Sequence, residues 1–155
     1  MKIKTWFKKL ALGSALTFAA TGAFAGAHGS IQHLNSGTVL PTTLPFSEIV
    51  VAGDFLFLSG QIGNLPGTLN IAPGGVEGQT RQVMDNIKTS LEANGYSMKH
   101  LIKCTVMLDD ISQWNAFNDV YKTYFEAGKY PARAAFGADG LAIGAAVEVD
   151  CLGVR

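Results

Sequence analysis

Residues 130–136, Tyr-Pro-Ala-Arg-Ala-Ala-Phe, and residues 146–152, Ala-Val-Glu-Val-Asp-Cys-Leu, are two apolar stretches that carry few charges. The second alternates between apolar and polar positions, which predicts a half-buried β-strand. In the first, Arg133 has apolar neighbours, and a guanidinium in such surroundings is costly unless it meets a carboxylate. Glu148 in the second stretch is the candidate partner. The two side chains could bind a small carboxylate and activate a water molecule, or they could form a structural ion pair, and their chemistry alone leaves both hypotheses open.

The other elements follow from the spacing of apolar residues along the chain. Helical spacing predicts helices at 78–94 and 112–127, the first ending before Gly95 and the second capped by Ser112. The run at 55–60 is apolar on both faces, so we expect it to be covered on both sides. Helices separated by strands indicate a single two-layer α+β domain. Apolar runs between glycine, proline and polar residues predict strands at 31–34, 47–52, 55–60, 101–108, 132–136 and 145–154.

Residues 1–25 have the pattern of a cleavable secretory signal peptide. Lysines precede an apolar run at 10–20, and Ala23-Phe24-Ala25 is a cleavage site of the A-x-A type. We therefore predict cleavage after Ala25, export to the periplasm and one mature domain at 26–155. An uncleaved membrane anchor is the alternative, but the apolar run is short for a span. The mature part holds eight basic and 12 acidic residues, and this net charge of −4 gives no support to nucleic-acid binding.

Cys104 and Cys151 lie in predicted strands, on the same side as neighbouring apolar residues. They could be two small core side chains, or they could form a disulfide, which requires neighbouring strands and an oxidising compartment. Together with three scattered histidines they form no metal-binding spacing. The glycines at 63–75 match neither a phosphate-binding loop nor a dinucleotide fingerprint. We therefore expect neither a metal ion nor an organic cofactor.

Several short motifs occur in a specific order along residues 31–154. They are Ser59-Gly60-Gln61-Ile62, Arg81-Gln82-x-x-Asp85-Asn86-Ile87-Lys88, Ile102-Lys103-x-Thr105-Val106, Phe117-Asn118-x-x-Tyr121 and Pro131-Ala132-Arg133, followed by the acidic last strand. Each motif is short, but their order and spacing together are specific. In this respect the chain resembles the Rid family of reactive-intermediate deaminases, also called the YjgF family.

The resemblance implies a chorismate-mutase-like fold, with a mixed sheet covered by two helices. It also implies a homotrimer whose sheets pack inward and whose three sites lie in clefts between subunits. The implied reaction is the hydrolysis of enamines and imines, such as 2-aminoacrylate, to a 2-keto acid and ammonia without a cofactor, as in 2-iminobutanoate/2-iminopropanoate deaminases. On this resemblance Arg133 pairs with the substrate carboxylate, and Glu148 holds or deprotonates the attacking water. Gly60 would offer a backbone contact, and Asn118 would lie near the cleft.

Two positions of the predicted substrate-binding site depart from the family pattern. Phe46 stands where the family has a tyrosine, so a hydroxyl that could contact the substrate is missing. Ala135 stands where a cysteine is frequent, which removes a thiol and changes the pocket. Phe46 and the export signal favour an alternative hypothesis, a non-catalytic periplasmic binding protein for small carboxylates or amino-acid metabolites on the same trimeric scaffold. The expected partners are an imine, an enamine or a 2-keto acid and further copies of the chain, with no nucleic acid and, after cleavage, no membrane.

Overall fold

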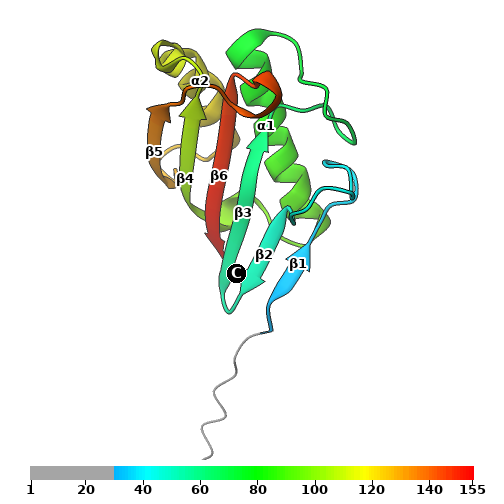
Figure 1. The fold of residues 1–155 in the computed structure, drawn as a ribbon. Helices are drawn as coiled ribbons and strands as arrows, with labels where there is room; N and C mark the ends of the chain where they lie inside the picture. Colours follow the sequence, from blue (N-terminus) through cyan, green and yellow to red (C-terminus); the bar gives the residue numbers. More distant parts are fainter. Residues whose placement is uncertain (1–29) are drawn as a thin grey trace, which may run out of the picture.

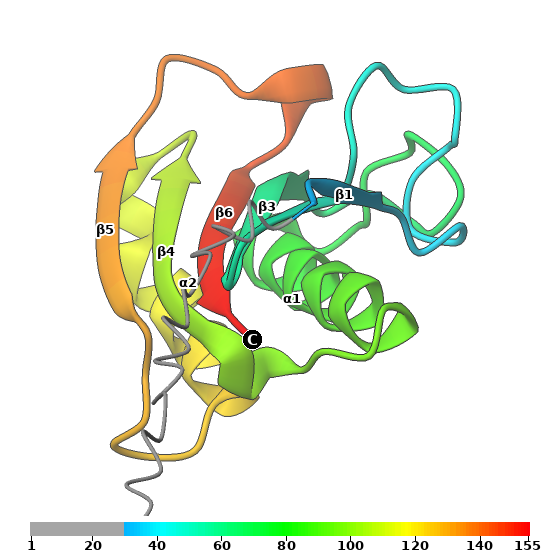
Figure 2. The ribbon, with the colours of Figure 1, turned by 90° about the horizontal axis from the view of Figure 1, so that it is seen from below.

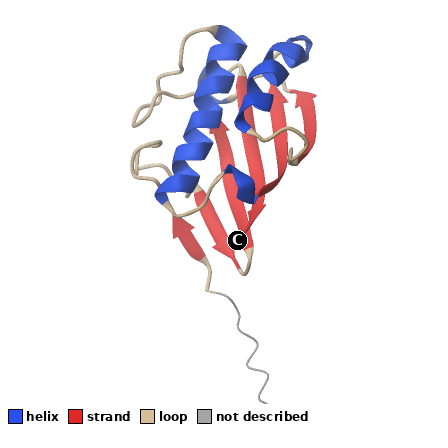
Figure 3. Cartoon of the chain, turned by 180° about the vertical axis from the view of Figure 1, so that it is seen from behind, coloured by secondary structure: helices blue, strands red, loops and turns tan. Residues whose placement is uncertain are grey.

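The structure, a computed structural model, describes residues 30–155 and has two layers, a six-stranded sheet and two α-helices (Figure 1). The predicted signal peptide and its cleavage site lie outside the described residues. Both helices lie on one face of the sheet (Figures 2 and 3). The elements are β1 (Gln32–Leu34), β2 (Ile49–Ala52), β3 (Phe55–Ile62), α1 (Gly75–Ala93), β4 (Leu101–Leu108), α2 (Trp114–Tyr121), β5 (Ala132–Gly137) and β6 (Val147–Val154).

The strands are ordered β1-β2-β3-β6-β4-β5 across the sheet. The neighbours β4 and β5 run parallel, and all other neighbouring strands run antiparallel. α1 packs over β3 and β6, whereas α2 lies beside β4 and β5 (Figures 1 and 2). A mixed sheet covered by two helices is the predicted α+β architecture, and this prediction is confirmed.

The first helix is amphipathic, with its apolar stripe facing the sheet. Val83, Met84, Ile87 and Leu91 of this stripe are fully buried. Gly95, just beyond the end of the helix, has a φ of 82°, a left-handed conformation that suits glycine at this position. The helix and its end are therefore as predicted, although it begins at Gly75 rather than at residue 78.

The second helix is shorter than predicted. α2 covers Trp114–Tyr121 and continues as a 3₁₀ turn to Tyr124, so the prediction of a helix at 112–127 is wrong at both ends. The predicted cap is also wrong, because Asp110 rather than Ser112 has this role. The Asp110 carboxylate accepts a hydrogen bond from the backbone N–H of Ser112 at 2.9 Å. A 3₁₀ turn precedes α2, and the capping position therefore moves to the residue before that turn.

The two cysteines are joined by a disulfide in the middle of the sheet. Cys104 in β4 and Cys151 in β6 are direct partners across these neighbouring strands, with 4.1 Å between their Cα atoms. Both are buried. Of the two interpretations that the sequence left open, the structure shows the disulfide. Arg133 of β5 is the partner of Cys104 on its other side, so the bridge lies next to the strand that carries this arginine.

The face of the sheet opposite the helices is open in the single chain. Phe55 and Phe57 of β3 are 47% and 49% exposed on this face. Our expectation that this strand is covered on both sides is wrong for the single chain, because both helices lie on the same face. Exposed apolar side chains gathered on a sheet face are typical of a surface that contacts another protein.

Candidate functional site

A β-bulge in β3 brings Gly60 against Glu148. The register of β3 on β6 shifts by one residue between Leu58 and Gln61, so the extra residue lies at Ser59-Gly60. A Cβ atom on Gly60 would overlap the carboxylate of Glu148. Because Gly60 has no side chain, the carboxylate can occupy this space. The bulge thus places Gly60, the residue predicted to contact the substrate through its backbone, beside Glu148, the predicted base.

Glu148 lies on the helix-free face of the sheet. It alternates with Val147 and Val149, which are fully buried beneath the helices, and successive side chains of a strand point to opposite faces. Burial raises the pKa of the Glu148 carboxyl group above its ordinary value, and the charge of Asp150 on the same face adds to this rise. A carboxylate with a raised pKa accepts a proton more readily, which suits a general base.

A hollow of about 410 Å³ opens beside Glu148. Among the described residues that line it, Glu148 is the only charged one. Ser59 also lines it, but the Ser59 hydroxyl donates a hydrogen bond to the backbone oxygen of Ser47 at 2.7 Å. Apart from Gln61, which is buried, the remainder of the lining is apolar and includes Leu40, Leu44, Phe46, Leu69 and Ile143.

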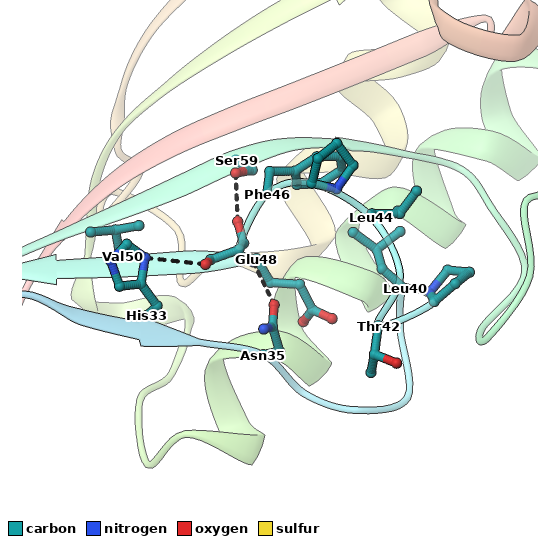
Figure 4. Close-up of a pocket in the computed structure, with 12 residues that line it drawn as sticks. His33, Asn35, Leu40, Thr42, Leu44, Phe46, Glu48, Val50 and Ser59 are labelled. Atoms are coloured by element: carbon teal, nitrogen blue, oxygen red, sulfur yellow. Dashed lines mark hydrogen bonds between the residues drawn. The ribbon is translucent and has the colours of Figure 1, made fainter.

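The loop that carries Phe46 borders a second hollow of about 540 Å³ (Figure 4). Leu40, Leu44 and Phe46 line both hollows. Figure 4 shows these side chains on the loop, together with Glu48 directly before β2. The position of this loop therefore decides the shape of the site.

Buried hydrogen bonds tie the Phe46 loop to α1. The backbone N–H and the hydroxyl of Ser36 donate to the two oxygens of the buried Glu48 carboxylate at 3.0 and 2.9 Å. Ser90 in α1 donates its hydroxyl to the same carboxylate at 2.5 Å. Glu48 is thus an anchor rather than a free acid, since each of its oxygens already accepts a hydrogen bond.

The loop that carries Leu69 is anchored to the same helix. The buried side chain of Asn64 donates to the backbone oxygens of Val39 and Thr68 at 3.0 and 3.1 Å. Asn86 in α1 donates in turn to the backbone oxygen of Asn64 at 2.9 Å. The two loops are therefore joined to each other and to one rigid element.

Arg133 lies on the other face of the sheet, against α2. Its guanidinium carbon is 4.4 Å from the ring centre of Trp114 and 4.6 Å from that of Tyr121, and Nη2 donates to Oδ1 of Asn118 at 2.7 Å. Burial raises the pKa of Tyr121 to about 12, so this ring is neutral beside the cation. Within residues 30–155 no carboxylate forms an ion pair with Arg133. A half-buried guanidinium held by aromatic rings, with most of its N–H groups still available, is suited to bind an anion.

The predicted site residues therefore form two groups. Arg133 lies with Asn118 and Ala135, and Ala135 lines a hollow of about 410 Å³ together with Trp114 and the guanidinium. Glu148 lies with Gly60 and Phe46 on the opposite face. The hypothesis of a structural ion pair between Arg133 and Glu148 is wrong within one chain. Because the two groups face away from each other, one chain cannot bring both to the same small ligand.

Two further findings concern residues 30–155. No group of three or more histidine, cysteine, aspartate or glutamate side chains in this part of the chain is placed to hold a metal ion. Neither of the two helices there is long and apolar enough to cross a membrane.

Comparison with known proteins connects this geometry to a family. The model of the endoribonuclease L-PSP family, which includes the Rid and YjgF proteins, matches residues 37–155. The chain belongs to this family. The resemblance seen in the sequence motifs is thereby confirmed.

Several members of the L-PSP family are similar to this chain over most of their length. A RutC family protein of Pyrococcus horikoshii is 41% identical over 111 residues, which are 72% of this chain and 87% of the relative. A 2-iminobutanoate/2-iminopropanoate deaminase of Capra hircus is 38% identical over 111 residues, 72% of this chain and 80% of the relative. The crystal structure of Escherichia coli TdcF with bound serine superposes with a TM-score of 0.73 at 29% identity, covering 80% of this chain and 98% of TdcF.

Sequence analysis missed residues in both groups. Among the aromatic residues of α2, Phe117 is fully buried, whereas Trp114 and Tyr121 hold the Arg133 guanidinium. Their helical spacing on the same face as Asn118 is a signal that could have indicated this. Leu69 and Ile143 lie in loops far apart in the sequence, and no local pattern indicates that they meet beside Glu148.

Proposed function

We propose that this protein hydrolyses 2-imino acids and their enamine tautomers to 2-keto acids and ammonia. Membership of the L-PSP family and similarity to relatives that are named 2-iminobutanoate/2-iminopropanoate deaminases support this proposal. The observation that carries it is the pair of complementary groups, an arginine available for a carboxylate and a half-buried glutamate with a raised pKa beside an apolar hollow.

The chemistry requires little of the protein, because the carbon of a protonated imine is already electrophilic. Arg133 binds the substrate carboxylate through its available N–H groups and fixes the position of the reacting carbon. Glu148 accepts a proton from the attacking water, whose oxygen forms a bond to that carbon. Glu148 then returns the proton to the nitrogen. As the carbon–nitrogen bond breaks, Glu148 accepts the proton of the new hydroxyl group, the carbonyl group of the 2-keto acid forms, and ammonia leaves and takes up that proton as ammonium. An enamine enters the same route after protonation on carbon.

We place each site between two copies of the chain, because Arg133 and Glu148 lie on opposite faces of the sheet. Arg133 of one copy would complete the hollow beside Glu148 of another. A homotrimer with the sheets packed inward would also cover Phe55 and Phe57, which the single chain leaves exposed. A mass near three times that of the mature chain, measured by light scattering, is the expected result.

The test of this function uses 2-aminoacrylate generated freshly in the presence of the mature chain, residues 26–155. We expect release of pyruvate and ammonia above the spontaneous rate, and loss of this excess in Arg133→Ala and in Glu148→Gln. Unchanged turnover in Arg133→Ala would refute the assignment. Binding of 2-keto acids without turnover by the wild-type trimer would instead support the binding-protein alternative, with the missing hydroxyl at Phe46 as its cause.

Mixing the two inactive variants tests whether the site is shared. Equal amounts of Arg133→Ala and Glu148→Gln are unfolded together, with the disulfide kept oxidised, and refolded. Random reassembly into trimers should restore about one quarter of the wild-type sites, because only an intact arginine next to an intact glutamate makes a working pair. Variants refolded separately are the control. Failure of the mixture to recover activity, with mixed trimers present, would place each complete site within one copy.

We also propose that the mature protein begins at Gly26 and is exported to the periplasm. The signal-peptide pattern supports this, and a disulfide between Cys104 and Cys151 suits an oxidising compartment. The mass of the protein recovered from a periplasmic fraction should equal that of residues 26–155. Recovery of the full-length chain from the cytoplasm alone would contradict export.

A further inference from the structure

The rim of the hollow beside Glu148 consists of large apolar side chains that water reaches. Phe46, Leu69 and Ile143 are 48%, 47% and 55% exposed, and they come from three separate loops. Apolar side chains gathered around one carboxylate are characteristic of a ligand site rather than of ordinary surface. The rim therefore favours a ligand with an apolar part next to its reacting group.

The backbone of Ile143 supports a role for its side chain. Ile143 has φ 48° and ψ 28°, in the left-handed region that a β-branched residue rarely adopts. Gly140 and Gly144 on either side also have positive φ, a conformation that glycine adopts without strain. An isoleucine in such a position keeps a branched side chain at the hollow at the expense of backbone strain, which is a feature of functional sites.

The three rim side chains are apolar, and the two uncharged polar residues in the lining of the hollow offer little to a polar substituent. Gln61 is buried, with a relative exposure of 2%. The Ser59 hydroxyl is occupied by the backbone oxygen of Ser47. The turn that carries Leu69 is closed by a hydrogen bond of 2.8 Å from the N–H of Leu65 to the oxygen of Asn70, so Leu69 is held in place. The hollow of about 410 Å³ is also larger than the methyl or ethyl group of a small 2-imino acid requires.

We infer that this site prefers 2-imino acids with a branched aliphatic or aromatic side chain, which Phe46, Leu69 and Ile143 contact. The inference rests on the proposed imine hydrolysis and specifies its substrate class. With the carboxylate on Arg133 of another copy and the reacting carbon beside Glu148, the substituent of the imine lies among these three side chains. Its apolar surface then replaces the water that now contacts them.

The test compares three imines generated in place by an amino acid oxidase from alanine, leucine and phenylalanine. The measured quantity is the rate of imine loss above the spontaneous rate, expressed as kcat/KM. We expect kcat/KM for the leucine-derived or the phenylalanine-derived imine to exceed that for the alanine-derived imine by at least about tenfold. Equal values, or a higher value for the alanine-derived imine, would overturn this inference and leave the proposed reaction intact. Hydrolysis of none of the three would refute the proposed reaction itself.

A variant of the rim connects the preference to Ile143. Ile143→Ala should reduce the ratio of kcat/KM for the larger imines to kcat/KM for the alanine-derived imine by about threefold to tenfold. Ile31→Ala is the matched control, because Ile31 is also an exposed isoleucine but lines neither hollow next to Phe46. If Ile143→Ala leaves the preference for the larger imines unchanged, Ile143 does not contact the substrate side chain.

Discussion

Gly60 and Glu148 lie so close across β3 and β6 that a side chain on Gly60 would occupy the position of the Glu148 carboxylate. Gly60→Ala should therefore displace the carboxylate while leaving the sheet intact, because Glu148 borders an open hollow and can move. A displacement of about 1 Å at the reacting group lowers kcat/KM on the order of 100-fold. Activity and the thermal midpoint should be measured together. Near wild-type activity in a correctly folded Gly60→Ala protein would show that this carboxylate does not need its present position.

Glu148→Gln should abolish turnover and yet raise stability at neutral pH. Burial raises the pKa of the folded carboxyl group, so the folded state binds a proton more tightly than the unfolded state does. Stability from this group is therefore present below the unfolded pKa and is lost as the pH rises through the folded value. The glutamine variant avoids this loss, so its thermal midpoint should exceed that of wild type at pH 7 and approach it below pH 4, measured by calorimetry. A thermal midpoint of Glu148→Gln below that of wild type at pH 7 would contradict the claim that burial of the ionised Glu148 carboxylate destabilises the fold.

Activity should fall on acidification for the same reason. Glu148 acts as a base only when it is ionised, and its raised pKa moves the loss of activity to a higher pH than an ordinary glutamate would give. The acidic limb of the kcat/KM profile should therefore have a midpoint above the ordinary value of 4.5. A midpoint of the acidic limb at or below 4.5 would exclude Glu148 as the group whose ionisation controls activity.

Trp114→Leu should weaken substrate binding more than turnover. The indole ring holds the Arg133 guanidinium at 4.4 Å, and such a contact contributes about 1 kcal/mol, or roughly fivefold in affinity. KM for 2-aminoacrylate should rise accordingly, with little change in kcat. Tyr130→Leu is a suitable control, because Tyr130 is an exposed aromatic residue that packs on Phe125 and not on Arg133. Equal effects of the two substitutions would argue against a specific role of Trp114.

Removal of the disulfide should destabilise the fold strongly. Cys104 and Cys151 are 47 residues apart, and a closed loop of this length stabilises the folded state by about 4 kcal/mol through the entropy of the unfolded chain. The double variant Cys104→Ala/Cys151→Ala should therefore have a thermal midpoint lower by on the order of 10–15 °C. Wild type treated with a reducing agent should behave in the same way. A change of only a few degrees in both experiments would show that the bridge adds little to the sheet.

The fold was largely predictable because its elements carry strong local patterns. The alternation at 146–152 and the apolar stripe of α1 specify a strand and a helix without any knowledge of their neighbours. Ser112 was misassigned as a cap because a 3₁₀ turn before α2 cannot be distinguished by sequence from the first turn of the helix. Errors of this kind lie at element boundaries, where several residues can supply the same hydrogen bond.

The candidate site was predictable only in part. Arg133 and Glu148 could be selected by their chemistry, but their spacing in the sequence does not reveal that they lie on opposite faces of the sheet. The register that separates them depends on strand pairing between β4, β5 and β6. The contribution of Ile143 depends on a backbone conformation that isoleucine rarely adopts, and a prediction based on residue preferences would not place it there.

The anchoring of the Phe46 loop and the Leu69 loop to α1 has a consequence for the speed of the catalytic cycle. Glu48 holds the Phe46 loop to Ser90, and Asn64 holds the Leu69 loop to Asn86, so these two walls of the hollow are in place before any ligand arrives. Little ordering entropy is then lost on binding, and no segment has to open before the product departs. Each turnover should therefore be limited by the bond-making steps or by diffusion, and not by the motion of a gate.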